Sequence, residues 1–330
     1  MWMYCWNFNG KFVFNVFLGD YMRELIVNEN DANQRVDKFL GKALNNLPKN
    51  LMYKYLRNKK IKVNHKRCEI SQRLQVGDIV TCYISEEFFI DNINEVFKQA
   101  INDLKIVYED NDIVIVDKPV GLLSQSDKLN DPDNVVDKLK KYLFFQGEYD
   151  PQQEASFAPA IANRLDRNTS GLIIGCKNAE SLRIINRLIK ERKISKHYLC
   201  IVANKLPSRG EFKDYYRRSD QQVTIQAQPF EGSKLVAIAY QCLDFHHNYS
   251  LADIDLLTGK THQIRAQMAF HGYPLLGDKR YGGSELNNRF QQLCAYQLIF
   301  NHSDEDGLKQ LVNKTIVLDD LAILKVFKTL

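Results

Sequence analysis

The polar stretch with the most unusual charge pattern reads NRLDRNTSG, from residue 163 to residue 171. It places one carboxylate, Asp166, between Arg164 and Arg167, directly before the apolar run LIIGCK (172–177), which is typical of a buried strand. Neighbouring residues of a strand point to opposite faces, so one of these arginines can be ordinary surface decoration. The alternative is a site that presents Asp166 from the start of a buried strand, where a carboxylate can attack a carbon or stabilise positive charge.

Two further clusters join strand-like sequence to charged or hydroxyl-bearing residues: SKHYLCIV (195–202) and LTGKTHQIRAQMAFHG (257–272). In the second cluster, a helix that starts near Thr261 would place His262 and Arg265 on one face. Arg265 has apolar helix neighbours, and we expect its side chain to reach toward a carboxylate. A structural ion pair is the other interpretation of Arg265.

The elements that must position these clusters are mostly strands. Apolar runs, alternating or continuous, predict strands within residues 105–110, 112–121, 172–177, 196–203, 222–229, 234–243 and 249–259. Helical spacing is found at 133–146 and at 179–193, where Asn178 can cap the helix. Because many strands have few helices between them, we expect an α+β catalytic domain on a mixed, largely antiparallel sheet. No GxGxxG follows a strand, which argues against a doubly wound dinucleotide fold.

The composition limits the class of protein further. A chain of 330 residues fits two domains or one large domain with an appendage, and 45% apolar with 26% charged residues is typical of a soluble globular protein. No apolar stretch approaches the length of a membrane span. The seven cysteines show no CxxC and indicate free thiols in a reducing cytoplasm. Neither the cysteines nor the seven histidines have zinc-site spacing, so we expect no metal.

Positive charge is concentrated in one part of the chain. The net charge is +5, but residues 23–80 hold thirteen Lys and Arg against six Asp and Glu. Helical spacing at 35–47 and 50–60, followed by strand-like runs at 61–64 and 74–84, predicts a small α/β module with an electropositive patch suited to phosphates. A solvated, charged helix face is the alternative interpretation.

Residues 23–85 resemble the alpha-L RNA-binding module found in a ribosomal small-subunit protein (protein four) and in several RNA-modifying enzymes. The resemblance suggests six phosphate contacts: Lys42, Lys54, Arg57, Lys59, Lys60 and Lys62. We expect residues 1–22 to be an extension outside the fold, with Met22 as the hypothesised working start. Residues 86–103 are expected to be a linker, and residues 104–330 the catalytic domain.

The polar clusters resemble, in order, those of the RluA-type pseudouridine synthase family over about residues 104–325. The family's arginine-leucine-aspartate, followed two residues later by threonine-serine-glycine, matches RLDRNTSG (164–171). Its other motifs match DKPVG (117–121), KHY (196–198), and TGKTHQIR together with GDKRYGG (277–283). One departure is Asn163, where the family commonly has histidine.

The resemblance implies an isomerase that converts uridine to pseudouridine in structured RNA and needs no cofactor. It implies that Asp166 acts at the ribose or the base of a flipped-out nucleotide, that Arg265 orients Asp166 as a bidentate partner, and that Tyr198 is the base. Candidate RNA contacts are Arg164, Thr169, Lys196, Lys260 and His262, with Lys118 a weaker candidate.

The expected substrate is bacterial large-subunit ribosomal RNA, because family members with the alpha-L module usually act on it. A transfer RNA target is the closest rival, and a non-catalytic RNA-binding or ribosome-assembly factor is the alternative from another class. We expect a monomer in the cytoplasm with no membrane partner.

Overall fold

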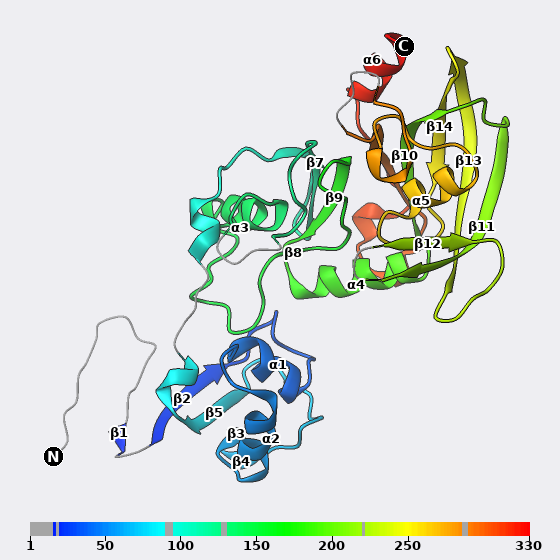
Figure 1. Cartoon of the computed structure of the whole chain (residues 1–330). Coiled ribbons are helices and arrows are strands. Elements are labelled where there is room, and N and C mark those ends of the chain that lie inside the picture. Colours follow the sequence, from blue (N-terminus) through cyan, green and yellow to red (C-terminus); the bar gives the residue numbers. More distant parts are fainter. Residues whose placement is uncertain (1–15, 18–19, 90–94, 127–130, 220–221, 286–289) are drawn as a thin grey trace. The chain divides into compact units, whose positions relative to one another are not determined.

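The computed structural model describes residues 16–17, 20–89, 95–126, 131–219, 222–285 and 290–330 (Figure 1). The chain divides into two compact units. Unit 1 comprises Met1–Asn94 and Asp150–Ala158, and unit 2 comprises Glu95–Tyr149 and Pro159–Leu330.

Unit 1 is a five-stranded antiparallel sheet covered by two helices. Its strands lie in the order β1 (Val16–Phe17), β2 (Asp20–Ile26), β5 (Ile79–Ile84), β3 (Ile61–Val63) and β4 (Lys66–Arg67). Helices α1 (Val36–Ala43) and α2 (Lys49–Arg57) follow the predicted spacing. Phe39 of α1 and Met52 of α2 are buried in one apolar core with Ile61 and Val80 of the sheet. The short helix η1 (Glu86–Phe89) follows β5.

A distant segment completes unit 1. In Asp150–Ala158, the carboxylate of Glu154 accepts hydrogen bonds from Asn28 Nδ2 at 2.9 Å and Asn30 Nδ2 at 2.7 Å. Ser156 donates its backbone N–H and its hydroxyl to Asp31 Oδ1. Burial raises the pKa of Asp31, and the hydrogen bonds from Ser156 oppose that shift. The segment Asp150–Ala158 therefore supplies hydrogen bonds to the Asp31 carboxylate, which would otherwise be buried in unit 1 without the bonds from Ser156.

The structure corrects two of the expected boundaries. Residues 20–22, which the sequence led us to place outside the fold, belong to β2 and pair with β5, as Met22 does with Tyr83. Residues 1–15 and 18–19 lie outside the described part. The expected linker contains η2 (Glu95–Gln99), whose Phe97 is 1% exposed and packs against Phe144 and Tyr149 of unit 2.

Unit 2 is built on an eleven-stranded mixed sheet. Nine strands lie in the order β12 (Val223–Gln226), β11 (Arg209–Arg218), β13 (Lys234–His246), β14 (Tyr249–Asp255), β10 (Ile194–Ala203), β15 (Leu293–Phe300), β9 (Ser170–Cys176), β7 (Ile113–Lys118) and β6 (Lys105–Glu109). Strand β16 (Thr315–Val317) pairs with β15, and β8 (Ala160–Ile161) pairs with β9. Among the strand pairs of the described residues, β9 with β15 is parallel and the others are antiparallel. The predicted α+β class is confirmed.

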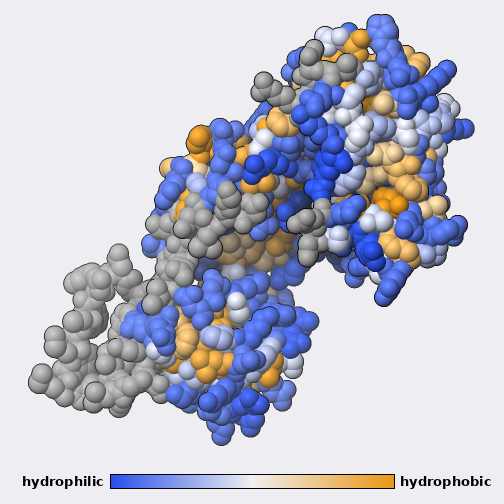
Figure 2. All heavy atoms as spheres, viewed as in Figure 1, coloured by the Kyte–Doolittle hydropathy of each residue, from blue (hydrophilic) through white to orange (hydrophobic). Residues whose placement is uncertain are grey.

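The helices of unit 2 are α3 (Val135–Phe145), α4 (Ala179–Lys190), α5 (Gln263–Phe270) and α6 (Ala322–Lys328), with the short helices η2, η3 (Lys279–Tyr281), η4 (Asp304–Asp306) and η5 (Lys309–Leu311). The predicted cap of α4 is present, because the side chain of Asn178 accepts from the Ser181 N–H at 2.8 Å. Ile185 and Leu188 of α4 are buried in the same core as Ile174 of β9. Hydrophilic residues cover most of the visible face of each unit (Figure 2).

Candidate active site

Asp166 lies in a tight loop between β8 and β9. The Thr169 N–H donates to the Asp166 carbonyl oxygen at 3.0 Å, which closes the loop, and Gly171 then enters β9 with a φ of 115°. A Cβ at Gly171 would lie 2.1 Å from the carbonyl oxygen of Ala295 in β15. The glycine of the TSG motif is therefore required for the close parallel pairing of β9 with β15.

The DKPVG segment holds this loop from the other side. Lys118 is 0% exposed, and its Nζ donates to the carbonyl oxygens of Pro119, Leu122 and Arg167 at 2.8–2.9 Å. Ser124 donates its hydroxyl to the Leu165 carbonyl at 2.7 Å and accepts from the Leu165 N–H at 2.9 Å. The backbone on both sides of Asp166 is thus fixed by buried side chains.

Lys118 is unavailable to phosphates, which corrects the sequence interpretation. All of its described hydrogen bonds go to backbone carbonyls inside the protein. Burial lowers the pKa of Lys118 to about 8, while the charges of Asp166 and Asp117 oppose that shift. The departure at Asn163 has a local explanation. Its side-chain Nδ2 donates to the Leu172 carbonyl oxygen and its Oδ1 accepts from the Ile174 N–H, so the side-chain amide pairs with β9 as the backbone of a neighbouring strand does.

Arg265 joins the Asp166 loop to helix α5. Its Nη1 donates to Asp166 Oδ2 at 2.9 Å, so two residues 99 positions apart in the sequence meet as predicted. The contact is not the bidentate one expected. The forked pair of Nε and Nη2 instead binds Asp278, at 2.6 and 2.8 Å. Burial acts to lower the pKa of Arg265, but the bonds to Asp278 and then Asp166 outweigh it and raise that pKa.

His262 lies next to the same carboxylate. It precedes α5 in the left-handed conformation, with a φ of 55°, so the helix begins two residues later than expected from Thr261. Its Nε2 is 3.7 Å from Asp166 Oδ2, and its Nδ1 is 3.0 Å from the Tyr281 hydroxyl. Burial lowers the pKa of His262 against the opposing charge of Asp166, which favours a neutral imidazole.

Tyr198 and Lys196 come from strand β10, which β15 separates from β9 in the sheet. Tyr198 is 6% exposed, and burial first, then the charge of Asp166, raise its pKa well above the usual value for a phenol. The phenol of Tyr198 is therefore protonated at neutral pH. Burial lowers the pKa of Lys196, and the charge of Asp255 opposes that shift.

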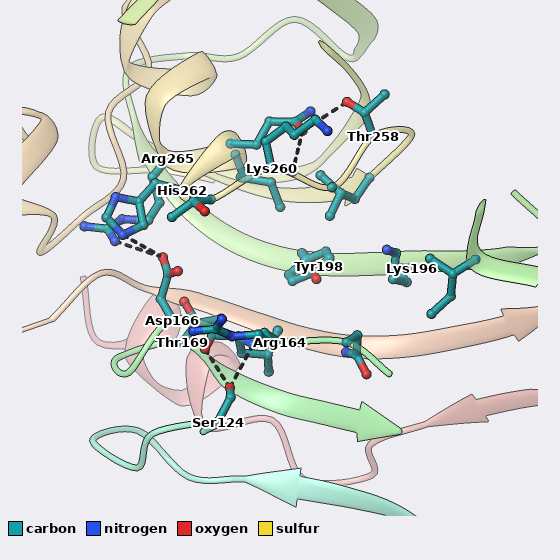
Figure 3. Close-up of a pocket in the computed structure, with 18 of the residues that line it drawn as sticks. Ser124, Arg164, Asp166, Thr169, Lys196, Tyr198, Thr258, Lys260, His262 and Arg265 are labelled. Atoms are coloured by element: carbon teal, nitrogen blue, oxygen red, sulfur yellow. Dashed lines mark hydrogen bonds and ion pairs between the residues drawn. The ribbon is translucent and has the colours of Figure 1, made fainter. Parts of the chain in front are cut away.

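These side chains line one pocket of about 1030 Å³, formed within unit 2. Figure 3 shows Asp166 pointing toward Arg265 and His262, with Tyr198 and Lys196 along strand β10. The acidic residues of the lining are Asp166 and Asp255. The basic ones are Arg164, Arg167, Lys190, Arg192, Lys196, Arg218, Lys234, Lys260 and Arg265. Such a concave, cationic surface attracts polyanions.

The five predicted RNA contacts of unit 2 all line the pocket but differ in exposure. Arg164 and Lys260 are exposed and line the pocket, as half-buried Lys196 and His262 also do. Thr169 is 2% exposed, and its hydroxyl accepts from Gln291 Nε2 at 3.4 Å. Thr169 also lines the pocket, so its hydrogen bonds favour a role in the loop structure and its contact with RNA stays a prediction.

The candidate phosphate contacts of unit 1 lie on α1, α2, the following turn and strand β3. Lys42, Lys54, Arg57 and Lys59 are exposed. Lys60 and Lys62 are half-buried, with their Nζ atoms 5.7 Å from the Tyr55 ring centroid and 5.1 Å from that of Tyr83. In the described part of the chain, no group of three or more His, Cys, Asp or Glu residues can hold a metal ion, and no helix is long and apolar enough to cross a membrane.

Sequence reasoning missed three residues of the site: Ser124, Asp278 and Tyr281. Ser124 lies just beyond DKPVG, and the other two lie inside GDKRYGG, so their segments were identified but their contacts were not. An acid directly after a glycine, Gly277–Asp278, was the signal that the sequence offered, and the structure shows this acid to be buried.

Comparison with known proteins supports the two-part organisation. Residues 112–270 match the RNA pseudouridylate synthase family, and residues 34–80 match the S4 domain. A Mycoplasma capricolum protein named as an uncharacterized RNA pseudouridine synthase is 34% identical over 312 residues, covering 90% of this chain and 97% of the relative. Ribosomal large subunit pseudouridine synthase C of Buchnera aphidicola is 28% identical over 84% of this chain and 87% of its own. The solved structure of human RNA pseudouridylate synthase domain containing 4 has a TM-score of 0.52 at 18% identity, over 68% of this chain and 92% of that one, and this likeness concerns the fold alone.

Proposed function

This chain belongs to the RNA pseudouridylate synthase family, and we propose that it isomerises specific uridines of large-subunit ribosomal RNA with Asp166 as the reacting carboxylate. The family and the relatives make the chain an RNA pseudouridine synthase with an S4 domain near its N-terminus. The observation that carries the assignment of Asp166 is its single hydrogen bond to Arg265, at 2.9 Å, inside a cationic pocket.

The reaction requires a group that can act at a sugar carbon. The bond from ribose C1′ to uracil N1 breaks, a bond from C1′ to C5 forms, a proton leaves C5, and N1 gains a proton. Atoms and oxidation state are unchanged, so no redox cofactor is needed. In this proposal Asp166 Oδ2 is held by Arg265, while Oδ1, which has no hydrogen bond among the described residues, faces the electron-deficient carbon or the base.

Tyr198 is proposed to handle the C5 proton. Its raised pKa keeps the phenol protonated, so a free phenolate is not available near neutral pH. We propose that the phenol oxygen takes the C5 proton as its own proton is passed on toward N1 of the uracil, so that the proton lost from C5 is balanced by the proton gained at N1 and no phenolate forms in the buried site.

Access to the uridine requires the nucleotide to leave its stack, at a cost of a few kcal/mol. Arg164, exposed two residues before Asp166, is positioned to contact the phosphate of the displaced nucleotide. Lys196, Lys260 and the other cations of the pocket would hold flanking phosphates, and the S4 domain would add affinity through Lys42, Lys54, Arg57, Lys59, Lys60 and Lys62.

Ribosomal RNA is favoured over transfer RNA by the names of several relatives, among them those of Buchnera aphidicola and Haemophilus influenzae, which are ribosomal large subunit pseudouridine synthases. The non-catalytic alternative is disfavoured because Asp166, Tyr198 and Arg265 line one pocket. A monomer acting in the cytoplasm remains our prediction. Light scattering of the purified protein would detect a dimer or a larger oligomer.

The test is pseudouridine mapping of total RNA from bacterial cells lacking the gene, before and after it is restored. The proposal predicts that defined positions of large-subunit ribosomal RNA lose and regain pseudouridine. Changes confined to transfer RNA would favour the rival substrate. No change at any position would favour a binding protein and contradict the proposed activity.

A further inference from the structure

The loop that follows α5 supplies a second carboxylate to Arg265. Asp278 is 1% exposed and accepts from Arg265 Nε at 2.6 Å and from Nη2 at 2.8 Å. These two parallel bonds use the forked side of the guanidinium. The remaining Nη1 makes the single bond to Asp166 Oδ2 at 2.9 Å.

The division of the guanidinium between two carboxylates matters for the reaction. A forked pair is the preferred geometry of an arginine with a carboxylate, so Arg265 without Asp278 would be free to turn its fork toward Asp166. Both oxygens of Asp166 would then be occupied. With Asp278 on the fork, Asp166 receives one N–H, and its Oδ1 stays without a hydrogen bond among the described residues.

The loop around Asp278 is built to keep that carboxylate in place. The Asp278 carbonyl accepts from the N–H groups of Tyr281 and Gly283, at 3.1 and 2.9 Å. A Cβ at Gly283 would lie 1.9 Å from the Leu275 carbonyl oxygen, so this tight turn requires glycine. The Arg265 guanidinium carbon also lies 5.2 Å from the centroid of the Tyr281 ring, which limits its movement on a second side.

We propose that Asp278 is a positioning residue for pseudouridine formation: it holds the forked side of Arg265 so that Asp166 is oriented by one hydrogen bond and keeps one oxygen free to react. This inference rests on the proposed function of Asp166. Asp278 itself is buried and is not among the residues that line the pocket, so it acts on the substrate only through Arg265.

The experiment compares Asp278→Asn with the wild-type protein under single-turnover conditions, with the full chain in excess over a ribosomal RNA fragment that the wild type modifies. Asparagine keeps the shape but presents one acceptor and one N–H₂ group to two donors of Arg265. We expect the rate constant at saturating protein to fall about 10- to 100-fold, because small misplacements of a reacting group have effects of that order. The protein concentration giving half the maximal rate should change less than threefold.

This design separates positioning from folding. With protein in excess, a partly unfolded variant shows a raised half-saturating concentration but an unchanged rate constant at saturation. Glu285→Gln is the matched control, because Glu285 lies in the same loop, is exposed and pairs only at the surface with Lys279 at 2.8 Å. That control should match the wild type within twofold.

The outcomes are distinct. A rate constant for Asp278→Asn within threefold of the wild-type value would overturn the positioning role while leaving the proposed function intact. A change only in the half-saturating concentration would also overturn it. Absence of pseudouridine with every ribosomal RNA fragment and the wild-type protein would count against the proposed function and, with it, against this inference.

Discussion

Removing the hydroxyl of Ser124 should lower both the stability of unit 2 and the rate of pseudouridine formation. Ser124 is 2% exposed, and its hydroxyl makes two hydrogen bonds to Leu165, the residue before Asp166. It donates to the Leu165 carbonyl oxygen at 2.7 Å and accepts from the Leu165 N–H at 2.9 Å. Ser124→Ala leaves two buried backbone groups without these partners. Each such group costs about 1–3 kcal/mol, so the free energy of unfolding of unit 2 should fall by about 2–4 kcal/mol after partial relaxation of the loop.

The rate should fall as well, because the displaced backbone carries Asp166. A shift of about 1 Å at a reacting group can cost roughly 100-fold, so we expect a loss of about 10- to 100-fold in the single-turnover rate. Urea unfolding followed by circular dichroism measures the first effect, and pseudouridine formation with protein in excess measures the second.

Two comparison variants sharpen that test. Ser124→Thr keeps the hydroxyl and should retain more of the rate than Ser124→Ala. Ser208→Ala, at an exposed serine of unit 2, should leave both quantities unchanged. The reasoning is refuted if Ser124→Ala stays within about 0.5 kcal/mol of the wild-type stability, the usual range for surface changes, and its rate stays within twofold.

Three further predictions concern the charges and buried acids. Replacing Arg192 and Lys234, which line the pocket, by alanine should reduce the slope of RNA affinity against salt concentration by about two phosphate contacts. The control Lys213→Ala, at a lysine in a surface pair with Glu211, should leave that slope unchanged. Equal slopes for the two variants in binding titrations across KCl concentrations would contradict this prediction. The single-turnover rate should not rise between pH 7 and 9, because Tyr198 stays protonated, and it should decline above pH 8 as Lys118 loses one of the N–H groups that bind three carbonyls. Burial lowers the pKa of Lys118 from 10.5 to about 8, so the unfolded chain binds more protons than the folded chain between pH 8 and pH 10.5. The contribution of Lys118 to stability therefore rises with pH in that range. A tenfold increase in the rate per pH unit would contradict the rate prediction and indicate a Tyr198 phenolate. Finally, Ser156→Ala should lower the stability of unit 1 by about 1–3 kcal/mol, measured by hydrogen exchange of β5 amides, because Asp31 loses a buried partner; unchanged exchange would refute that contact.

Much of the site was accessible from the sequence because its motifs lie at strand ends. The apolar run after Asp166 and the apolar setting of Arg265 predicted a buried strand and an inward arginine, and β9 and α5 are found there. Their contact across 99 residues came from the family resemblance, since no local pattern specifies it.

The remaining features depend on packing that local patterns do not encode. The sequence shows that Lys118 follows a strand, where lysines are usually solvated, but not that three carbonyls converge on its Nζ. The sequence motifs likewise did not single out β15, although it lies between β10 and β9 in the sheet. The bidentate bond assigned to Asp166 was wrong because Asp278, 13 residues from Arg265, takes the fork.

The most direct test of the central claim is pseudouridine formation by Asp166→Asn. The change keeps the shape of the side chain and removes the carboxylate that Arg265 binds. The assay is single-turnover conversion of a ribosomal RNA fragment, with Asp320→Asn as the control at an exposed acid that pairs with Lys325. Our account predicts no detectable pseudouridine with Asp166→Asn, RNA affinity within threefold of the wild-type value, and full activity of the control. Conversion by Asp166→Asn at the wild-type rate would contradict it.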